Sequence, residues 1–185
     1  MCSSDLAMKI FVSALISALA LTGLTGCAEK IPAKYTDGKV IGCSDIKIEG
    51  NAGLQVQCVG DENLINLDSL RGPMILNVWG SWCAPCQDEI PYLRHFYDKY
   101  KNKVQIVGLD VEEPNKKTPQ SFIKSNGITW PSLYDPDGRT RKLIGMGVPV
   151  TWFIDSNGKV IHKKIGVFSN YQELEDSAKK YFNLR

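Results

Sequence analysis

The chain has 185 residues, which is enough for one domain with a short appendage and too few for two full domains. Hydrophobic residues make up 43% of the chain, so a sizeable core can be buried, and the formal net charge is only +2. Because acidic and basic residues are mixed throughout, there is neither the basic block expected of a nucleic-acid-binding protein nor an acidic disordered tail, and no nucleic-acid partner is expected.

The N-terminus has the pattern of a bacterial export signal. Lys9 precedes an apolar run at 10–24, which is shorter than the ~20 residues that a membrane-spanning helix needs. The run ends in Leu-Thr-Gly-Cys, and small residues before a cysteine at this place look like a lipobox. We therefore expect residues 1–26 to be a cleaved signal peptide and Cys27 to become the lipidated first residue. An uncleaved anchor and an ordinary signal peptide are the alternatives.

A lipidated Cys27 would place the protein on the extracytoplasmic face of a bacterial membrane. Lipid chains bind a membrane with ~0.8 kcal/mol for each buried CH2 group. Residues 27–42 show little periodicity and would form a tether, followed by the folded domain at 43–185. Paired cysteines can form disulfides in such a compartment.

The predicted elements of the domain alternate regularly along the chain. Alternating apolar and polar residues at 53–59 predict a strand, whereas the spacing at 63–70 fits either a strand or a helical turn. Asn157-Gly158 between two β-rich runs predicts a hairpin. Further strands are predicted at 73–80, 104–111, 132–134, 150–155 and 159–167, and helices at 86–101, 118–125, 139–144 and 171–181.

This order predicts an α/β domain. Strands and helices alternate first, and two strands and a helix end the chain, so a mixed central sheet with helices on both faces is expected. Residues 43–61 come before this alternation and form an N-terminal β extension.

Two cysteines, Cys83 and Cys86, lie between a predicted buried strand and the helix after it. At a helix N-terminus, free N–H groups and the helix dipole stabilise a thiolate, which is the attacking species in disulfide exchange. The second cysteine lies one turn further on, close enough to resolve the resulting mixed disulfide. Pro85 fits the first helical turn, where its missing N–H costs nothing. The pattern predicts a redox-active pair.

Two other interpretations of this pair are weaker. A zinc site would need a second pair of ligands, for which only Cys43 and Cys58 are candidates, because His95 and His162 lack ligand spacing. A purely structural disulfide would close too short a loop to constrain the unfolded chain much. No metal is therefore expected.

The segment Trp-Gly-Ser-Trp-Cys-Ala-Pro-Cys at 79–86 resembles the active-site region of the thioredoxin superfamily. With Asn77, Glu89 and Pro91, it is similar to the TlpA/ResA/CcmG branch, whose members are membrane-tethered, extracytoplasmic and thioredoxin-like. The resemblance covers about residues 60–185. It implies a thioredoxin-like three-layer sandwich and a thiol–disulfide oxidoreductase that needs no cofactor.

The resemblance also assigns residues that bind substrate. The segment Gly-Val-Pro-Val-Thr at 147–151 resembles the family segment whose proline is cis and packs against the active-site disulfide. It implies that Pro149 is cis, that Val148 offers its backbone groups to the substrate, and that Trp82 lines the approach. Without the cysteine pair, a trans turn before a strand would be the preferred interpretation.

Asn77 occupies the position of the buried aspartate that cytoplasmic thioredoxins use in proton transfer. Glu89 offers a substitute, because it follows Cys86 by three residues and shares its side of the helix. A partly buried carboxyl there would have a raised pKa and could exchange protons with the thiols. An exposed first-turn glutamate is the alternative. Glu112 and Glu113 follow a strand, where a solvated loop is expected, although a role in substrate choice is open.

Cys43 and Cys58 precede the core of the domain, and a disulfide between them is the natural pairing in an exported protein. It would stabilise the fold by ~3 kcal/mol in the loop-entropy model. A second redox pair that passes electrons to Cys83 and Cys86 is the alternative.

The resemblance to the TlpA/ResA/CcmG branch implies reduction of disulfides in exported proteins, including a role like that in cytochrome c maturation, with electrons drawn through a membrane protein. Ala84-Pro85 between the cysteines resembles the reducing members of the family more than the strong oxidants. A disulfide-forming oxidase is one alternative. A non-catalytic metal-delivery or assembly factor on the same fold is another.

Overall fold

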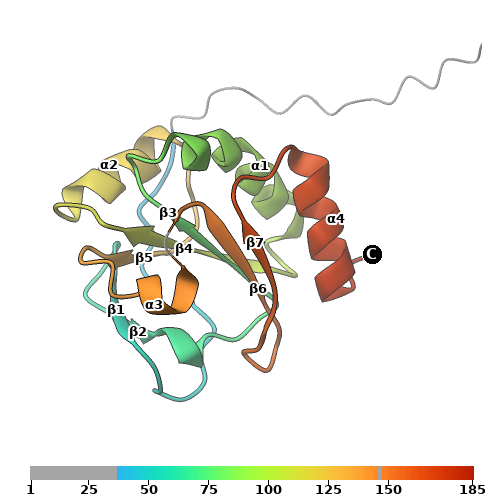
Figure 1. Ribbon diagram of the computed structural model, residues 1–185, viewed down its shortest axis with the longest axis horizontal. Coiled ribbons are helices and arrows are strands. Elements are labelled where there is room, and N and C mark those ends of the chain that lie inside the picture. Colours follow the sequence, from blue (N-terminus) through green and yellow to red (C-terminus); the bar gives the residue numbers. More distant parts are fainter. Residues whose placement is uncertain (1–36, 146) are drawn as a thin grey trace, which may run out of the picture. The chain divides into compact units, whose positions relative to one another are not determined.

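The computed structural model describes residues 37–145 and 147–185 (Figure 1). The expected signal peptide, Cys27 and most of the expected tether lie outside these residues. The described residues form a seven-stranded sheet in the order β2-β1-β5-β4-β3-β6-β7. The strands are β1 (Gln55–Cys58), β2 (Leu64–Asn66), β3 (Met74–Trp79), β4 (Gln105–Val111), β5 (Ser132–Asp135), β6 (Val150–Ile154) and β7 (Val160–Ile165).

The sheet is mixed, as predicted. Strands β3, β4 and β5 are parallel, whereas β6 and β7 on one side and β1 and β2 on the other add antiparallel pairs. The carboxyl ends of β3 and β4 therefore meet at one edge, where sites form in sheets of this kind.

Helices cover both faces of the sheet (Figure 1). Side chains of α1, α2 and α4 join one core cluster, and α3 with the 3-10 helix joins the other. The helices are α1 (Ala84–Tyr100), α2 (Lys117–Ser125), α3 (Arg141–Ile144), α4 (Tyr171–Phe182) and the 3-10 helix Leu67–Ser69. The predicted thioredoxin-like arrangement is confirmed.

The two core clusters follow from the alternation of side chains along a strand. In β3, Ile75 and Trp79 belong to the α1 cluster, whereas Leu76 and Val78 belong to the α3 cluster. All six residues of β3 are buried, as expected for a central strand covered on both faces. This division decides which side chains can reach the helix that carries the cysteine pair.

The start of the described chain packs on the domain. Gly38 donates its N–H to the carbonyl of Lys124, and Lys39 donates to the carbonyl of Ile128. A Cβ at Gly38 would lie 2.0 Å from the carbonyl oxygen of Ile123, so only glycine fits this approach. The segment expected to be a tether is thus bound to the domain from Gly38 onward.

The segment at 63–70, which fitted either a strand or a helical turn, contains both, because β2 passes directly into the 3-10 helix.

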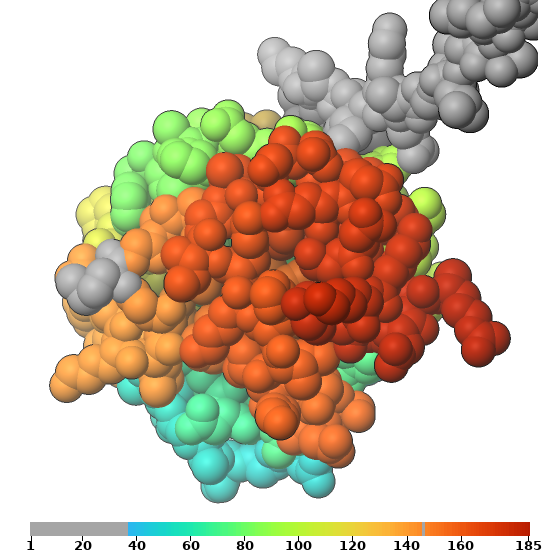
Figure 2. Space-filling view, turned by 45° about the vertical axis from the view of Figure 1, so that its right-hand side comes forward, coloured from blue at the N-terminus to red at the C-terminus, as the bar shows by residue number. Residues whose placement is uncertain are grey.

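Strands β2 and β7 form the two edges of the sheet, and β7 lies at the surface beside α4 (Figure 2). Lys163 and Lys164 on this strand suit an exposed edge, where charge opposes pairing with another chain. Among the described residues, no helix combines the length and the apolar character needed to cross a membrane.

Candidate active site

The cysteine pair lies directly after β3, at the start of α1. Cys83 is the N-cap residue of α1, and a disulfide joins its sulfur to that of Cys86, with 5.3 Å between the Cα atoms. The N–H of Cys86 donates to Sγ of Cys83 over 3.2 Å. Cys83 is 4% exposed and Cys86 is fully buried.

These positions give the two sulfurs different chemistry. A Cys83 thiolate would keep the N–H of Cys86 and the positive end of the helix dipole, both of which stabilise negative charge. Of the two cysteines, only Cys83 has any exposed surface, so a partner disulfide would react with Cys83 and not with the enclosed Cys86. Cys83 is therefore suited to attack, and Cys86 to resolve the mixed disulfide from within.

Glu89 is fully buried and points towards the sheet from α1. Asn77 of β3 donates from Nδ2 to Oε1 of Glu89 over 2.7 Å, and the Phe168 N–H lies 3.4 Å from Oε2. Burial raises the pKa of Glu89 from 4.5 to about 7, although these hydrogen bonds and the charge of Lys164 oppose the shift. A carboxyl with this pKa can both accept and donate a proton near neutral pH.

Some residues around the Asn77–Glu89 pair were not foreseen from the sequence. Thr151 lies opposite Asn77 in the β3–β6 pair and accepts a 3.2 Å hydrogen bond from the same amide group. Phe168 and Lys164 come from the β7–α4 region, far along the chain. Only Thr151 had a sequence signal, because it belongs to the segment that resembles the cis-proline loop.

The Val148–Pro149 peptide bond is cis, as the resemblance implied. Pro149 is buried, and among the described residues the N–H and C=O of Val148 have no hydrogen-bond partner. Both groups can therefore bind an incoming backbone. Trp82 is 55% exposed, and its Nε1 donates to the Val111 carbonyl over 3.4 Å. A second cis bond, Gly72–Pro73, was not foreseen.

The expectation of a solvated loop at Glu112 and Glu113 is wrong for Glu113. Glu113 is only 3% exposed, and its Oε1 accepts a 2.7 Å hydrogen bond from the Ser81 N–H in the turn before Cys83. Its carbonyl also accepts from the Tyr134 hydroxyl. Glu113 therefore holds the active-site turn, whereas Glu112 stays partly exposed.

A second buried carboxyl, Asp110, lies beside Trp79 in the β3–β4 pair. It is fully buried, and neither carboxyl oxygen has a hydrogen-bond partner among the described residues. Burial, together with the nearby charges of Glu113 and Asp135, raises its pKa from 3.8 to about 9. Asp110 is therefore neutral in the folded protein at pH 7.

We expect Asp110→Asn to stabilise the fold increasingly as pH rises. The raised pKa means that the folded state holds a proton that the unfolded state loses above its own pKa of 3.8, so the native carboxyl costs stability between about pH 4 and 9. The advantage of asparagine should grow by up to ~1.4 kcal/mol per pH unit in that range. Thermal unfolding at pH 5 and 8 measures it, with exposed Asp137→Asn as control. An equal effect at both pH values would contradict this expectation.

Cys43 and Cys58 form a disulfide with an S–S distance of 2.00 Å. Both sulfurs belong to the α3 cluster, whereas Cys83 and Cys86 belong to the α1 cluster on the other face of the sheet. This separation favours a structural role over electron relay. Asp61 lies close to the two sulfurs, and these three residues are the one group of three or more possible metal ligands among the described residues whose ligand atoms lie within 4.8 Å of one another. Because Cys43 and Cys58 are joined in a disulfide, neither has a free thiol group.

We expect Cys43→Ala combined with Cys58→Ala to lower the unfolding free energy by ~3 kcal/mol, because the unfolded chain regains the freedom of the open loop. The midpoint of thermal unfolding should fall by roughly 6–12 °C. Disulfide exchange at Cys83 should persist below that midpoint. Loss of exchange in the folded double variant would instead support electron relay.

Comparisons with known proteins agree with this geometry. Residues 50–163 match the AhpC/TSA family. Thiol-disulfide oxidoreductase ResA of Bacillus anthracis is 36% identical over 119 residues, or 63% of this chain and 68% of ResA. StoA of Bacillus subtilis is 26% identical, with a TM-score of 0.55 over 69% of this chain and 96% of StoA. The thiol:disulfide interchange protein DsbE of Chlorobium tepidum is 23% identical, with a TM-score of 0.58 over 71% of this chain and 94% of its own.

The family match spans more than half of the chain, and the cysteine pair lies inside it. The ResA match covers more than two thirds of that relative. The fold agrees independently, because StoA and DsbE share it. The chain therefore belongs to the AhpC/TSA family, and it is a thiol–disulfide oxidoreductase similar to ResA and to the TlpA/ResA/CcmG branch.

Proposed function

We propose that this oxidoreductase is a membrane-anchored reductase of disulfides in exported proteins. One observation carries the proposal: the helix-capping sulfur of Cys83, which is 4% exposed, is joined to the fully buried sulfur of Cys86, on the same helix as the buried carboxyl of Glu89. Such a site combines an attacking thiolate, a resolving thiol and a proton carrier. Ala84-Pro85 between the cysteines, which resembles reducing members of the family, supports the direction.

The reaction has two exchange steps. The Cys83 thiolate attacks one sulfur of the substrate disulfide, a Cys83–substrate disulfide forms, and the other substrate sulfur leaves as a thiolate. Glu89 takes the proton of Cys86, whose thiolate then attacks Cys83 and releases the second substrate thiol. The enzyme dithiol loses two electrons, and the substrate disulfide gains them. Val148 and Pro149 align the substrate backbone, and Trp82 lines its approach.

The cellular setting is proposed from the sequence. Residues 1–26 would direct export, and Cys27 would carry the lipid that keeps the domain on the extracytoplasmic face of a bacterial membrane. A membrane protein would return two electrons to Cys83 and Cys86. A role like that in cytochrome c maturation and general reduction of exported proteins both fit this setting.

Paired assays test the proposed direction. With dithiothreitol as donor, the protein should accelerate reduction of insulin disulfides, and the same protein in disulfide form should be a poor catalyst of disulfide formation in reduced, unfolded ribonuclease. Cys83→Ser should abolish the first activity. Strong catalysis of ribonuclease oxidation without insulin reduction would replace the reductase by a disulfide-forming enzyme. Inactivity in both assays would leave a non-catalytic assembly role.

A further inference from the structure

Polar side chains form a row across the sheet beneath α1. Asn77 of β3 lies opposite Thr151 of β6, and Thr151 lies opposite Lys164 of β7. Residues that pair directly across neighbouring strands point to the same face of the sheet. This face is the one that α1 covers, because Asn77 donates a hydrogen bond to Glu89 of α1. The row therefore leads from the buried carboxyl of Glu89 to the edge strand of the sheet.

Lys164 is held at the outer end of this row. Its Nζ lies 2.5 Å from Oε1 of Glu173 on α4 and 5.7 Å from the centre of the Phe168 ring. Phe168 is buried, and its N–H lies 3.4 Å from Oε2 of Glu89. The ammonium group of Lys164 therefore lies over the same residue whose backbone reaches the carboxyl of Glu89.

Glu173 is fixed by the start of α4. Its N–H donates to Oδ1 of the N-cap residue Asn170 over 2.9 Å, and its Oε2 accepts a 2.7 Å hydrogen bond from the Ser169 N–H. The hydrogen bonds from Lys164 and Ser169 lower the pKa of Glu173, so it is a carboxylate near neutral pH. Glu173 therefore presents a fixed negative charge to Lys164.

The charge of Lys164 acts on Glu89. Burial raises the pKa of Glu89, and the positive charge of Lys164 opposes that rise. The side chains of Lys164 and Glu173 are 27% and 33% exposed, so water screens their charges only in part. Lys164 therefore changes how much of Glu89 is carboxylate at a given pH.

The other side chains on this face bring no competing charge at neutral pH among the described residues. Asp110 of β4 keeps its proton, because burial raises its pKa to about 9. Burial also lowers the pKa of His162 on β7, which stacks on Tyr181 with 4.2 Å between the ring centroids. The titratable side chains about one turn from Glu89 on α1 are Cys86 and Tyr92.

We propose that Lys164 is a positioning residue for resolution of the mixed disulfide: its ammonium group stabilises the Glu89 carboxylate that takes the proton of Cys86, and Glu173 holds and moderates this charge. The inference rests on the proposed function, in which Glu89 is the proton carrier, and adds the pair that tunes it.

The neighbouring lysine shows that an exposed edge alone does not explain Lys164. Lys163 also puts charge on the edge strand, which opposes pairing with another chain. Its side chain lies on the other face of the sheet, however, with Nζ 4.2 Å from the centre of the Trp152 ring. The two lysines therefore carry equal charge, and Lys164 is the one on the face of Glu89.

A chromogenic disulfide, dithiobis-nitrobenzoate, follows resolution directly. In the reduced full chain, Cys2→Ser and Cys27→Ser remove the cysteines outside both disulfides. The Cys83 thiolate attacks the reagent, one coloured thionitrobenzoate leaves, and a mixed disulfide forms. Glu89 takes the proton of Cys86, whose thiolate attacks Cys83 and releases a second thionitrobenzoate. The dithiol loses two electrons, which the reagent gains, and its two protons pass to water. The second release gives the resolution rate.

Lys164→Gln should move the midpoint of the rate–pH curve upwards by about 0.5 pH unit or more, because the carboxylate loses its positive neighbour. The original midpoint is expected near pH 7. Below it the variant should resolve about threefold more slowly, whereas the plateau at high pH is kept because Glu89 itself is intact. Lys164→Arg keeps the charge and should restore the original midpoint. An unmoved midpoint in Lys164→Gln, or a lower plateau in both variants, would overturn the proposal.

Glu173→Gln tests the sign of the effect. Glutamine keeps an oxygen for the Ser169 N–H but removes the negative charge, so the charge of Lys164 acts on Glu89 without compensation. The midpoint should therefore move to lower pH, opposite to the shift in Lys164→Gln. Damage to packing would not move the two variants in opposite directions. An upward shift in Glu173→Gln would overturn the moderating role of Glu173.

Lys163→Gln is the matched control on β7. It removes an equal charge one residue away, on the face of the sheet that Glu89 does not reach. Its midpoint should stay at the original value. A shift as large as that of Lys164→Gln would mean that the total charge of the strand matters and not the position of Lys164, which would overturn the proposal.

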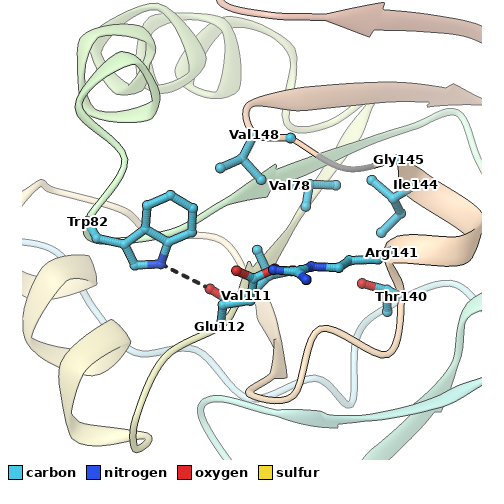
Figure 3. Close-up of a pocket in the computed structure, with 10 residues that line it drawn as sticks. Val78, Trp82, Val111, Glu112, Thr140, Arg141, Ile144, Gly145 and Val148 are labelled. Atoms are coloured by element: carbon cyan, nitrogen blue, oxygen red, sulfur yellow. Dashed lines mark hydrogen bonds and ion pairs between the residues drawn. The ribbon is translucent and has the colours of Figure 1, made fainter.

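A second control breaks a different ion pair close to the cysteines. Arg141 forms a salt bridge with Glu112, whose φ angle of 58° lies in the left-handed region that favours glycine (Figure 3). Both residues line a pocket on the face of the sheet away from Glu89, because Val78 and Ile144 in its lining belong to the α3 cluster. Arg141→Gln should therefore leave the midpoint unchanged, and an upward shift would contradict the specific role of Lys164.

The original protein separates failure of this inference from failure of the proposed function. A midpoint that is present in the original chain, lost in Glu89→Gln and unmoved by the change at Lys164 would overturn the role of Lys164 alone. A resolution rate without any inflection in the original chain would contradict Glu89 as the proton carrier, and with it the proposed mechanism.

Discussion

Cys86→Ser protein is expected to accumulate a stable disulfide between Cys83 and its substrate, while turnover falls to the uncatalysed background. Cys83 keeps its position at the N-cap of α1, where the N–H of Cys86 and the helix dipole stabilise its thiolate, so the first exchange still proceeds. Resolution needs a second thiolate held behind Cys83, and a serine hydroxyl cannot supply it. Mass spectrometry of the acid-quenched reaction would identify the trapped partner.

The matched variant Cys83→Ser separates the two roles. Its remaining thiol, Cys86, is fully buried, so it should trap no substrate and show no turnover. Trapping by Cys83→Ser in place of Cys86→Ser would reverse the assignment. Turnover by Cys86→Ser with no trapped partner would contradict the two-step mechanism.

Glu89→Gln should slow resolution of the mixed disulfide by about 10²-fold or more near pH 7. With a pKa of about 7, a growing fraction of Glu89 is carboxylate as pH rises through neutrality, so the original rate should rise there and then level off. Glutamine removes this inflection.

Two controls separate proton transfer from damage to the fold. Asp88→Asn changes an exposed carboxyl on the same helix and should leave the pH profile unchanged. Because the pKa of Glu89 is raised, the folded protein binds this proton more tightly than the unfolded chain does. The original protein therefore loses stability as pH rises from about 4.5 to 7. Glu89→Gln should therefore be no less stable at pH 8. A pH profile that keeps its inflection in Glu89→Gln would exclude Glu89 as the proton carrier.

The sequence predicted the fold well because its signals are local. Alternation in β1, the continuous apolar run of β3 and the Asn157-Gly158 turn each depend on neighbouring residues only. The segment at 63–70 was ambiguous because three strand residues and a 3-10 turn share it. The attachment of Gly38 was hidden, because it depends on carbonyl groups of α2 and the segment after it.

The candidate site was predictable where one motif carries the chemistry and hidden where tertiary contacts carry it. Cys83 and Cys86 are visible from their spacing after a strand. Burial of Glu113 and Asp110 depends on how β3, β4 and β5 pack together, which no local pattern reports. The left-handed backbone of Glu112 gave no signal either, since glycine is the residue that marks such positions.

The reduction potential of the Cys83–Cys86 pair tests the central claim most directly. The protein would be equilibrated in dithiothreitol or glutathione buffers and acid-quenched, and the two disulfides would be followed separately by peptide mass spectrometry. A reductase fed with electrons through the membrane predicts a value near ~−270 mV, similar to that of thioredoxin. A value near ~−120 mV, typical of a strong oxidant, would contradict the reductase and identify a disulfide-forming enzyme.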